Sequence, residues 1–498
     1  MTPAARAIVV PTALAAVLAA GYLAISPASQ DLAAATFRAD LFSEHGFTLW
    51  NNQWYSGHYL LSYSVTFPPL AAWLGVRVVG ALAVVAAAAV FAALAHGRFG
   101  KRALIPSLWF AAAAASWLLT GRMTFLLAVP FGLGALLAVD RGRPWFAALL
   151  AALSTLASPV AGLFVGLAGV AIWLAGERLR GAVLALAAGV PMLALNLAFP
   201  VGGEEPFVFS AFVALPLLTL GVLLLVPAEY RAIRIGTVLY ALLALAVFVV
   251  ANPLGGNVTR LGALFAGPVA ALLVWPRGRW VVLAVSLPLL YWQLVAPVRD
   301  LSKAAGDRST EAGFYDSLNR ELDSIEAREG EFRVEIPPTE NRWEAAYVAP
   351  GHALARGWLR QLEHQDFDLF TDGNLTAEAY AAWLRDHTVR YIAVPDAPRD
   401  YLAEDEVALI ESGLDYLDPV WTGESWALYA VRDGAPLGAT VTAPDTFSVS
   451  GVGEHAVAIE HSRYFEVTEG EGTVSEGEGG RTVVESESDR VVVEARLP

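Results

Sequence analysis

The stretch GTVLYALLALAVFVVANPLGGNVTRLGALFAGPVAALLVW, residues 236–275, decides the fold class of this chain. Two apolar runs, near 235–252 and 261–275, flank a turn that is rich in glycine and asparagine. A helix needs about 20 mainly apolar residues to cross a hydrocarbon layer about 30 Å thick. The stretch therefore predicts two membrane helices joined by a short polar turn.

Outward from this pair, similar runs recur on the N-terminal side and once more on the C-terminal side. The full set lies near 7–26, 78–96, 103–120, 124–139, 145–158, 160–175, 181–200, 207–227, 235–252, 261–275 and 280–297. We therefore predict an α-helical polytopic membrane domain over residues 1–299 with about 11 transmembrane helices. The runs on either side of Ser158-Pro159 can also be a re-entrant pair.

Charge divides the chain at the same place. Residues 1–299 carry a net charge of +9 and residues 300–498 a net charge of −24, within a chain of 498 residues and net charge −15. Neither part has the clustered Lys and Arg of a nucleic-acid binder, so no nucleic-acid partner is expected. The absence of cysteine excludes thiol catalysis, thiolate metal sites and disulfides.

Basic residues predict the orientation of the chain in the cell membrane, because basic loops are retained in the cytoplasm. One set of alternate loops, together with Arg6, holds Arg98, Lys101, Arg102, Arg141, Arg143, Arg178, Arg180, Arg231, Arg234, Arg277 and Arg279. These loops and the N-terminus should be cytoplasmic. With an odd number of helices, the C-terminal part is then extracytoplasmic.

The C-terminal part predicts two soluble regions. Over 300–433, expected helices at 311–328, 375–386 and 404–412 alternate with expected strands at 332–336, 389–394 and 426–431, which indicates an α/β domain. Over 434–498, short alternating runs separated by Gly, Glu and Ser predict an acidic, β-sandwich-like domain. The segment EGEGTVSEGEGG at 469–480 is expected to be a solvated turn or loop.

The densest group of functional residue types lies in the long first external loop, 27–77. Its first part can form an interfacial helix over 30–44 that places Asp40 and Glu44 four residues apart on one face. Two such carboxylates can act as a general base with a supporting acid, or as ligands of a divalent cation such as Mg²⁺ or Mn²⁺. A solvated polar face is the structural alternative.

The same loop combines aromatic rings with amide groups. Trp54, Tyr55 and Tyr59 surround His58, and Asn51, Asn52 and Gln53 lie nearby. Rings can stack on the apolar faces of sugars while amides and imidazoles bond their hydroxyls, so we predict a substrate-binding role. An interfacial aromatic belt and a structural histidine are the alternatives.

The turn NPLGGNVTRLG, residues 252–262, predicts a second binding feature. Amides freed by Gly255 and Gly256, the side chain of Asn257, a helix N-terminus and Arg260 can together hold a phosphate. Arg122 and Arg38 are further candidates for a phosphate, and a plain turn with an interfacial anchor is the alternative. The chain has no phosphate-binding GxxxxGK[ST] motif, no His-rich metal pattern and no GxSxG elbow, and its apolar runs are nearly free of charge, which disfavours an ion-coupled transporter.

Many helices, a long first external loop with an acid after an interfacial helix, and a C-terminal external domain together resemble the GT-C superfamily of membrane glycosyltransferases. More narrowly, Trp54-Tyr55-Ser56-Gly57-His58-Tyr59 and Ser64-Val65-Thr66-Phe67-Pro68-Pro69-Leu70 resemble segments of uncharacterised actinobacterial multi-spanning membrane proteins. The superfamily resemblance implies a polyprenyl-phosphate sugar donor and a loop acid that activates the acceptor hydroxyl. That role falls on Asp40, with Glu44 as the second acid, although the usual closer acid pair is replaced here by a spacing of four.

Together these features lead us to expect an integral-membrane glycosyltransferase. It would transfer a sugar from a polyprenyl-phosphate donor to a glycan or lipid acceptor of the cell envelope, at the outer face of the cytoplasmic membrane. Two alternatives stay open: a transporter or flippase of a lipid-linked envelope molecule, and a non-catalytic envelope scaffold.

Overall fold

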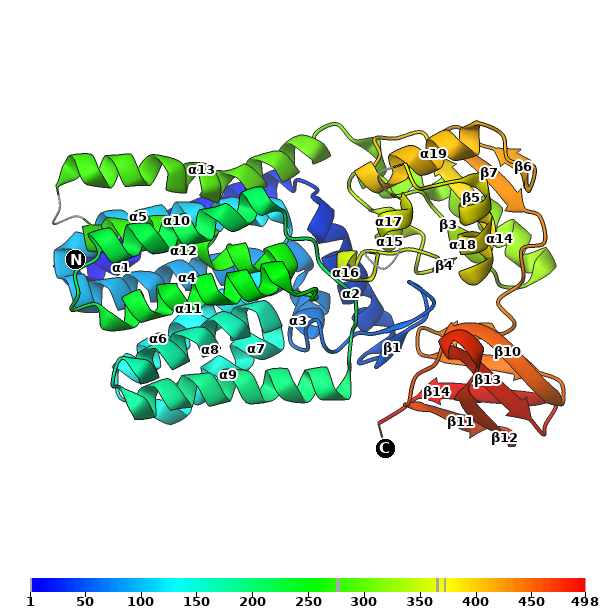
Figure 1. The fold of residues 1–498 in the computed structure, drawn as a ribbon, viewed down its shortest axis with the longest axis horizontal. Coiled ribbons are helices and arrows are strands. Elements are labelled where there is room, and N and C mark those ends of the chain that lie inside the picture. The colour runs from blue at the N-terminus through cyan, green and yellow to red at the C-terminus, as the bar shows by residue number, and fades with distance from the viewer. Residues whose placement is uncertain (1, 275–277, 364–366, 371–372, 498) are drawn as a thin grey trace. The chain divides into compact units, whose positions relative to one another are not determined.

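The chain divides into two compact units in a computed structural model that describes residues 2–274, 278–363, 367–370 and 373–497. Unit 1 comprises Met1–Ala35 and Ser62–Ser302, and unit 2 comprises Thr36–Leu61 and Lys303–Pro498. Figure 1 shows the helices of unit 1 and the mixed helices and strands of unit 2. The first external loop is therefore shared: its middle, 36–61, groups with the C-terminal residues, whereas the sequence assigned all of 27–77 to the membrane domain.

Unit 1 is helical. Its helices are α1 (Pro3–Ile25), α3 (Phe67–Leu74), α4 (Val76–Phe99), α5 (Leu104–Ser116), α6 (Met123–Asp140), α7 (Pro144–Ala157), α8 (Pro159–Leu174), α9 (Arg178–Ala198), α10 (Phe209–Leu225), α11 (Arg231–Val249), α12 (Arg260–Val274) and α13 (Arg279–Ala304), and it holds the start of α2 (Gln30–His45). Proline at the first position begins α7 and α8, where the missing amide proton costs nothing. Their junction is a single extended residue, Ser158.

Each of the eleven predicted apolar runs coincides with a helix, although Trp275 and Arg277 lie outside the described residues. Seven helical stretches among the described residues are long and apolar enough to cross a membrane: Ala5–Ile25, Val76–Thr120, Met123–Asp140, Arg178–Ala198, Arg231–Val249, Gly255–Val274 and Trp280–Ala304. The second of them contains both α4 and α5, and α7, α8 and α10 are shorter apolar helices. The chain is thus a membrane protein, and the number of crossings stays a prediction.

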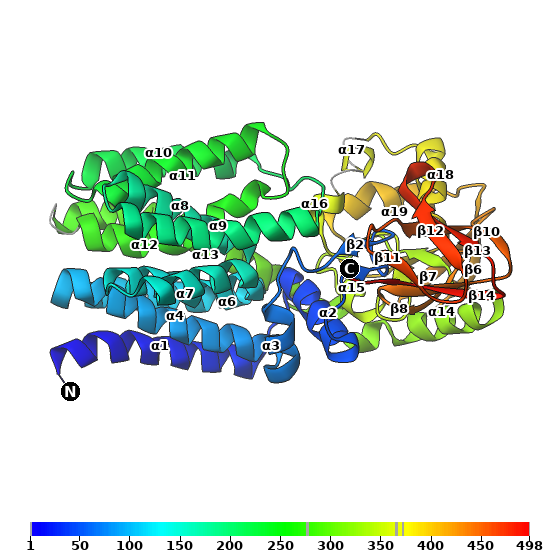
Figure 2. The same cartoon turned by 90° about the horizontal axis from the view of Figure 1, so that it is seen from below.

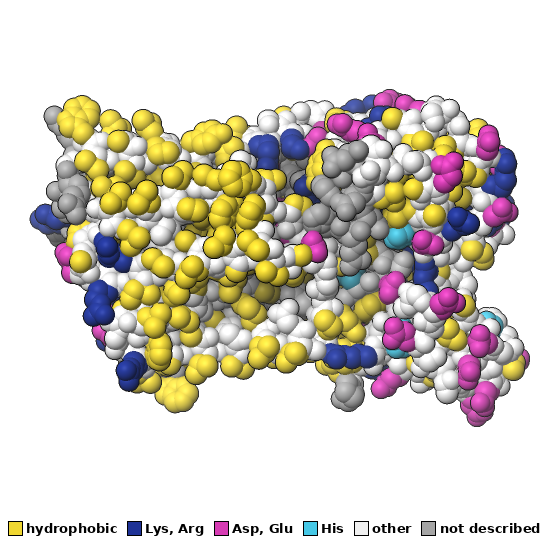
Figure 3. Space-filling model, in the orientation of Figure 1, with side chains coloured by type: hydrophobic (Ala, Val, Ile, Leu, Met, Phe, Trp, Pro, Cys, Tyr) yellow, Lys and Arg dark blue, Asp and Glu magenta, His cyan; other side chains and the backbone are white. Residues whose placement is uncertain are grey.

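The surface of unit 1 fits a lipid environment. Hydrophobic side chains cover most of the visible face of its helices, whereas acidic side chains are frequent on unit 2 (Figure 3). Inside the unit, small residues allow close helix contact. A Cβ added at Gly169 of α8 would lie 2.5 Å from the Ala185 nitrogen of α9, so the two backbones nearly touch.

The ends of these helices differ in charge. The predicted cytoplasmic cations from Arg98 to Arg234 lie in the turns that follow α4, α6, α8 and α10 or in the helix ends that flank these turns. These turns lie at the same end of unit 1 as the N-terminus (Figures 1 and 2). The side of the membrane that this end faces stays a prediction. Asp31, Arg122 and Arg260 lie at the opposite helix ends.

Unit 2 contains a five-stranded mixed sheet in the order β4-β3-β5-β7-β6. Its strands are β3 (Arg333–Glu335), β4 (Ala353–Leu354), β5 (Val389–Pro395), β6 (Leu417–Thr422) and β7 (Trp426–Val431). β3 pairs in parallel with β4 and β5, and β7 is antiparallel to both neighbours. The accompanying helices are α14 (Asp316–Glu329), α15 (Glu344–Tyr347), α16 (Arg360–Glu363), α17 (Phe367–Phe370), α18 (Ala377–Asp386) and α19 (Glu404–Glu411).

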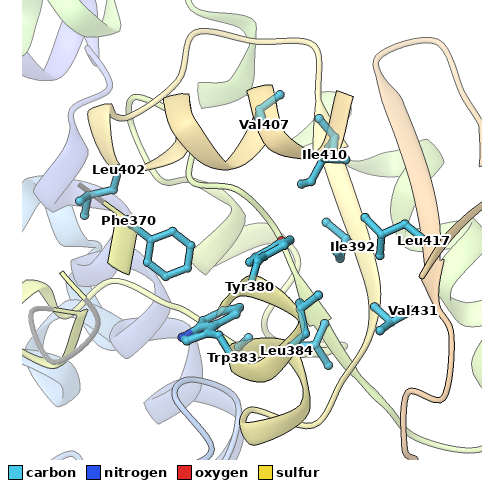
Figure 4. Packing of buried hydrophobic residues seen from close by; sticks show 13 residues of the cluster. Phe370, Tyr380, Trp383, Leu384, Ile392, Leu402, Val407, Ile410, Leu417 and Val431 are labelled. Atoms are coloured by element: carbon cyan, nitrogen blue, oxygen red, sulfur yellow. The ribbon is translucent and has the colours of Figure 1, made fainter. Parts of the chain in front are cut away.

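The core of this α/β region lies between α18, α19 and the sheet (Figure 4). Tyr380 and Leu384 of α18 meet Val407 and Ile410 of α19, and Ile392 of β5 packs against them. All five side chains are buried. Every helix and strand predicted over 300–433 is present.

The C-terminal region forms two antiparallel sheets. One has the order β10-β13-β12 and the other β11-β14-β9-β8. Their strands are β8 (Thr440–Ala443), β9 (Thr446–Ser450), β10 (Gly453–Glu460), β11 (Phe465–Glu469), β12 (Gly472–Glu476), β13 (Arg481–Ser486) and β14 (Arg490–Ala495). The expectation that 469–480 is wholly a loop is wrong, because β12 pairs with β13 there.

Candidate functional site

The two predicted catalytic carboxylates lie on one exposed face of α2. Asp40 and Glu44 are exposed and one helical turn apart, as expected. The pKa of Asp40 is raised above its ordinary value, first by desolvation of its carboxylate and then by repulsion from Glu44. A raised pKa makes a carboxylate a stronger base, so this pair suits proton abstraction.

A divalent cation would find two protein ligands on this face of α2, the carboxylates of Asp40 and Glu44. Mg²⁺ usually binds one or two carboxylates and takes its remaining oxygens from water and substrate phosphate. Among residues 2–274, 278–363, 367–370 and 373–497, no group of three or more His, Asp or Glu side chains is arranged to hold a metal ion.

The aromatic residues predicted to bind substrate, Trp54, Tyr55 and Tyr59, lie in unit 2. Trp54 is fully buried, and both Phe37 and His58 stack on its ring, at centroid distances of 4.1 and 5.8 Å. A Cβ added at Gly357 would lie 2.3 Å from Trp54 Cγ, so the backbone of the α/β region also touches this ring. These contacts make Trp54 part of a protein core.

Polar atoms of the loop also form hydrogen bonds with other residues of unit 2. The amide of Leu359 donates to the Tyr55 hydroxyl at 3.1 Å, and Ser462 Oγ donates to the Tyr59 hydroxyl at 3.2 Å. Main-chain bonds run from Asn52 N to Pro444 O and from Leu354 N to Gln53 O, both at 2.8 Å. The hairpin of β1 (Trp50–Asn51) and β2 (His58–Tyr59) thus joins the five-stranded sheet region to the C-terminal strands.

His58 and Arg38 complete this buried group. Burial, and then the positive charge of Arg38, lower the pKa of His58 to about 3, so His58 is neutral at physiological pH. Arg38 is buried, with its guanidinium carbon 5.7 Å from the Trp54 ring centroid. Arg38, which the sequence suggested as a phosphate ligand, therefore lies with Trp54, Tyr55 and His58 in a packed setting that holds the end of α2.

A second charged group lies in unit 1. Arg122, between α5 and α6, places Nε 2.8 Å from Asp31 Oδ2 in the first turn of α2. Burial alone would lower the pKa of Arg122, but attraction to Asp31, Asp300 and Glu205 raises it. We call Asp31, Arg122, Glu205, Arg260 and Asp300 the helix-end cluster.

Arg260 begins α12 and is the other cation of the helix-end cluster. Its Nη2 donates to Asn257 Oδ1 at 2.5 Å, and its guanidinium carbon lies 5.6 Å from the Phe125 ring centroid. Arg260 Nε is buried and has no hydrogen-bond partner among the described residues. Arg260 and Arg122 are close enough to repel each other electrostatically, and Asp31 and Glu205 attract both.

The expectation that glycine amides of the turn are free for a phosphate is wrong. Gly255 N donates to Asn252 Oδ1 and Gly256 N donates to Pro206 O, each at 3.0 Å. The φ of Gly255 is +44°, which allows the turn to fold back onto Glu205. The cation of this turn is Arg260, and Arg122, which lies between α5 and α6, is close enough to interact with it electrostatically.

The sequence singled out Arg122, Asn257 and Arg260 but did not connect them with Asp31, Glu205 or Asp300. The available signal was that Asp31, Arg122, Glu205 and Arg260 all fall on loops of the same predicted side. Charge complementarity within that set could have paired Arg122 with an acid. The choice of Asp31 needed the three-dimensional arrangement.

No protein-family model and no curated protein matches this chain. Among solved structures, one match is the crystal structure of the Archaeoglobus fulgidus oligosaccharyltransferase tethered with an acceptor peptide. The match has a TM-score of 0.46 and 11% sequence identity, and it covers 86% of this chain and 74% of that chain. A likeness this distant carries no argument about function, and the proposal below rests on the helix-end cluster and on the α2 carboxylates.

Proposed function

We propose that this protein is a membrane glycosyltransferase of the GT-C type. It transfers a sugar from a polyprenyl-phosphate donor to a glycan or lipid acceptor of the cell envelope, at the outer face of the cytoplasmic membrane. The observation that carries the proposal is the pair of arginines, Arg122 and Arg260, at the helix ends of a membrane unit. A phosphate linked to a membrane-embedded lipid reaches such helix ends without any nucleotide-binding motif.

The chemistry assigns one role to each charged group. The acceptor oxygen attacks the anomeric carbon, the bond from that carbon to the phosphate oxygen breaks, and the phosphate leaves with the electron pair. Because the leaving phosphate gains negative charge, Arg122 and Arg260 stabilise the transition state more than the ground state. Asp40 takes the proton of the acceptor hydroxyl, and Glu44 raises its basicity.

Other residues position these charged groups. Asp31 holds the Arg122 guanidinium through the 2.8 Å ion pair, and Asn257 holds that of Arg260. The buried loop residues Arg38, Trp54, Tyr55, His58 and Tyr59 fix α2 and hence Asp40. This assignment replaces the direct sugar contact that the sequence suggested for these rings.

Binding of a lipid phosphate tests the proposal. Native mass spectrometry of the detergent-purified protein with undecaprenyl phosphate should show a stoichiometric complex. Arg260→Gln removes charge-assisted hydrogen bonds and should weaken binding about tenfold or more. Arg141→Gln, at an exposed turn between α6 and α7, is the matched control and should bind as the wild type does. Equal binding by the two variants would refute the phosphate assignment.

A further inference from the structure

A second group of charged and aromatic side chains lies in unit 2, at the carboxyl ends of its parallel strands. The loop after β3 holds Arg342, the segment after β4 holds Trp358 and Arg360, and the loop after β5 holds Asp400 and Tyr401. The loops after β3 and β5 also bond to each other: Glu340 N donates to Pro398 O, and Asp400 N donates to Pro338 O.

The topology makes this edge a favourable place for a ligand. From β3 the chain runs to β4 on one side, and from β5 it runs on to β6 and β7 on the other side. Adjacent parallel strands whose connections leave in opposite directions form a topological switch point, and α/β sheets bind ligands outside the carboxyl ends of such strands.

Arg360 is the accessible cation of this group. Its guanidinium carbon lies 5.6 Å from the Trp358 ring centroid and 5.5 Å from the Tyr401 ring centroid, and its side chain is 27% exposed. Nη2 lies 3.3 Å from Asp400 Oδ2, and Asp400 is its only hydrogen-bond acceptor in the part of the chain that the structure describes. The two rings and Asp400 thus orient a guanidinium that retains unused N–H donors.

A buried ion network lies behind Arg360 and holds Asp400 in place. Arg342 is fully buried, pairs with Glu363, and lies 3.4 Å from Asp400 Oδ1. Asp400 therefore divides its charge between Arg342 and Arg360. Arg342 also holds a positive φ of 56°, an uncommon conformation for arginine that the network must stabilise.

We propose that Arg360, Tyr401 and Asp400 form a binding site for a sugar that carries an oxyanion, either a carboxylate or a phosphate. Arg360 would bond the oxyanion through its free donors, in the forked geometry that guanidinium groups offer. Tyr401 is 46% exposed, so its ring would pack against the apolar side of the sugar. This site lies outside the helix-end cluster and does not depend on the proposed transfer reaction.

Binding to the full-length protein in detergent tests the site, with D-glucuronate, D-glucose 1-phosphate and neutral D-glucose as probes. Calorimetric titration should show binding of at least one anionic sugar, and glucose should bind about tenfold more weakly or not at all. Binding of glucuronate alone would identify a carboxylate site, and binding of glucose 1-phosphate alone a phosphate site.

Three variants locate the binding. Arg360→Gln should lower the affinity about tenfold, and Arg360→Lys should restore only part of it because lysine lacks the fork. Arg399→Gln, which alters a neighbouring arginine paired with Glu411, is the control and should bind normally. Arg260→Gln should also bind glucuronate normally, which separates this site from the proposed lipid-phosphate site.

Several results would overturn the proposal. These are no binding of either anionic sugar at millimolar concentration, equal affinity for neutral glucose, or equal loss in Arg360→Gln and Arg399→Gln. A melting curve for each variant identifies any loss that comes from unfolding, and in that case Arg360→Lys and Tyr401→Ala decide the outcome. Tyr401→Ala should weaken binding severalfold if the ring contacts the sugar.

Discussion

At the scale of single residues, desolvation and one neighbouring carboxylate both raise the pKa of Asp40. Desolvation favours the protonated carboxyl, and the negative charge of Glu44 one turn away favours it further. A general base works best when its pKa lies near the operating pH, and both effects move Asp40 in that direction. Glu44 thereby gains a role without touching the acceptor.

Replacing Glu44 with glutamine should move the acid limb of the activity profile to lower pH. The variant removes the repulsion, so the pKa of Asp40 falls and the base stays ionised in more acidic solution. The pH dependence of sugar incorporation into endogenous acceptor in isolated membranes measures this shift. Glu311→Gln, at an exposed position of unit 2, should leave the profile unchanged, and an unshifted Glu44→Gln profile would contradict the role given to Glu44.

His58 should make the protein less stable in mildly acidic solution. Its pKa is about 3 in the folded protein and ordinarily about 6.5, so the unfolded chain binds the proton first as the pH falls. Above pH 6.5 His58 is neutral in both states and the unfolding free energy does not depend on its protonation. Below pH 6.5 protonation of the unfolded chain lowers the unfolding free energy by up to about 1.4 kcal/mol per pH unit. Melting temperatures of the wild type and His58→Gln, compared between pH 7 and pH 5, should show a smaller slope for the variant. Equal slopes would mean that His58 is accessible to protons when folded.

At the scale of elements, the hairpin of β1 and β2 depends on a close contact with the segment after β4. Trp54 forms a parallel bridge with Leu354 and lies against the backbone at Gly357. The hairpin therefore extends the packing of the five-stranded sheet region. Such a contact tolerates no side chain at position 357.

Gly357→Ala should destabilise unit 2 by about 1–3 kcal/mol, because its methyl group would overlap the fully buried Trp54 ring. Thermal unfolding of the purified protein, followed by near-ultraviolet circular dichroism, measures the change. Gly351→Ala is the matched control, since a Cβ there meets its nearest atom at 3.9 Å. A Gly357→Ala protein as stable as the control would show that Trp54 can move aside.

Elements with strong periodicity were predictable from the sequence, and elements formed by tertiary contacts were not. The eleven apolar runs and the helix Gln30–His45 follow from composition and spacing alone. Strand β6 was missed because most of its residues are exposed and it contains Pro419, which is typical of an edge strand. Strand β12 was missed because its glycine- and glutamate-rich sequence forms a strand only by pairing with β13.

The sequence named most residues of the candidate site but did not show which of them lie together. Asp40 and Glu44 share a helix, so spacing alone places them together. The pairing of Arg122 with Asp31 joins positions 91 residues apart and needs the fold. The burial of Trp54 and Tyr59 could not be predicted either, because a loop that binds sugar and a loop that packs inside a domain can have the same aromatic-rich sequence.

At the scale of the whole molecule, the middle of the first external loop, residues 36–61, is part of the second unit. Residues 36–61 bond to Pro350, Leu354, Pro444 and Glu460, which lie far along the chain. A membrane-anchored loop thus supplies buried residues to a domain that the chain otherwise completes after residue 302. Folding of that domain must wait for both pieces.

Residues 303–498 expressed alone should therefore aggregate or unfold without cooperativity. Fusing residues 36–61 to that fragment through a flexible linker should restore a sharp melting transition, because Trp50 and Trp54 regain their partners. The same fusion with Trp54→Ala serves as the control and should melt broadly. A cooperative transition in residues 303–498 alone would contradict this shared-core description.

The central claim is that the chain transfers a sugar to an envelope acceptor with Asp40 as the base. Glycan linkage analysis of a deletion strain tests it most directly, with complementation by the wild type, Asp40→Asn or Glu311→Gln. Loss of a general base lowers the rate about 10²–10⁴-fold, so one linkage should vanish in the deletion strain and return with the wild type and Glu311→Gln but not with Asp40→Asn. An unchanged glycan in every strain, or full restoration by Asp40→Asn, would contradict the account.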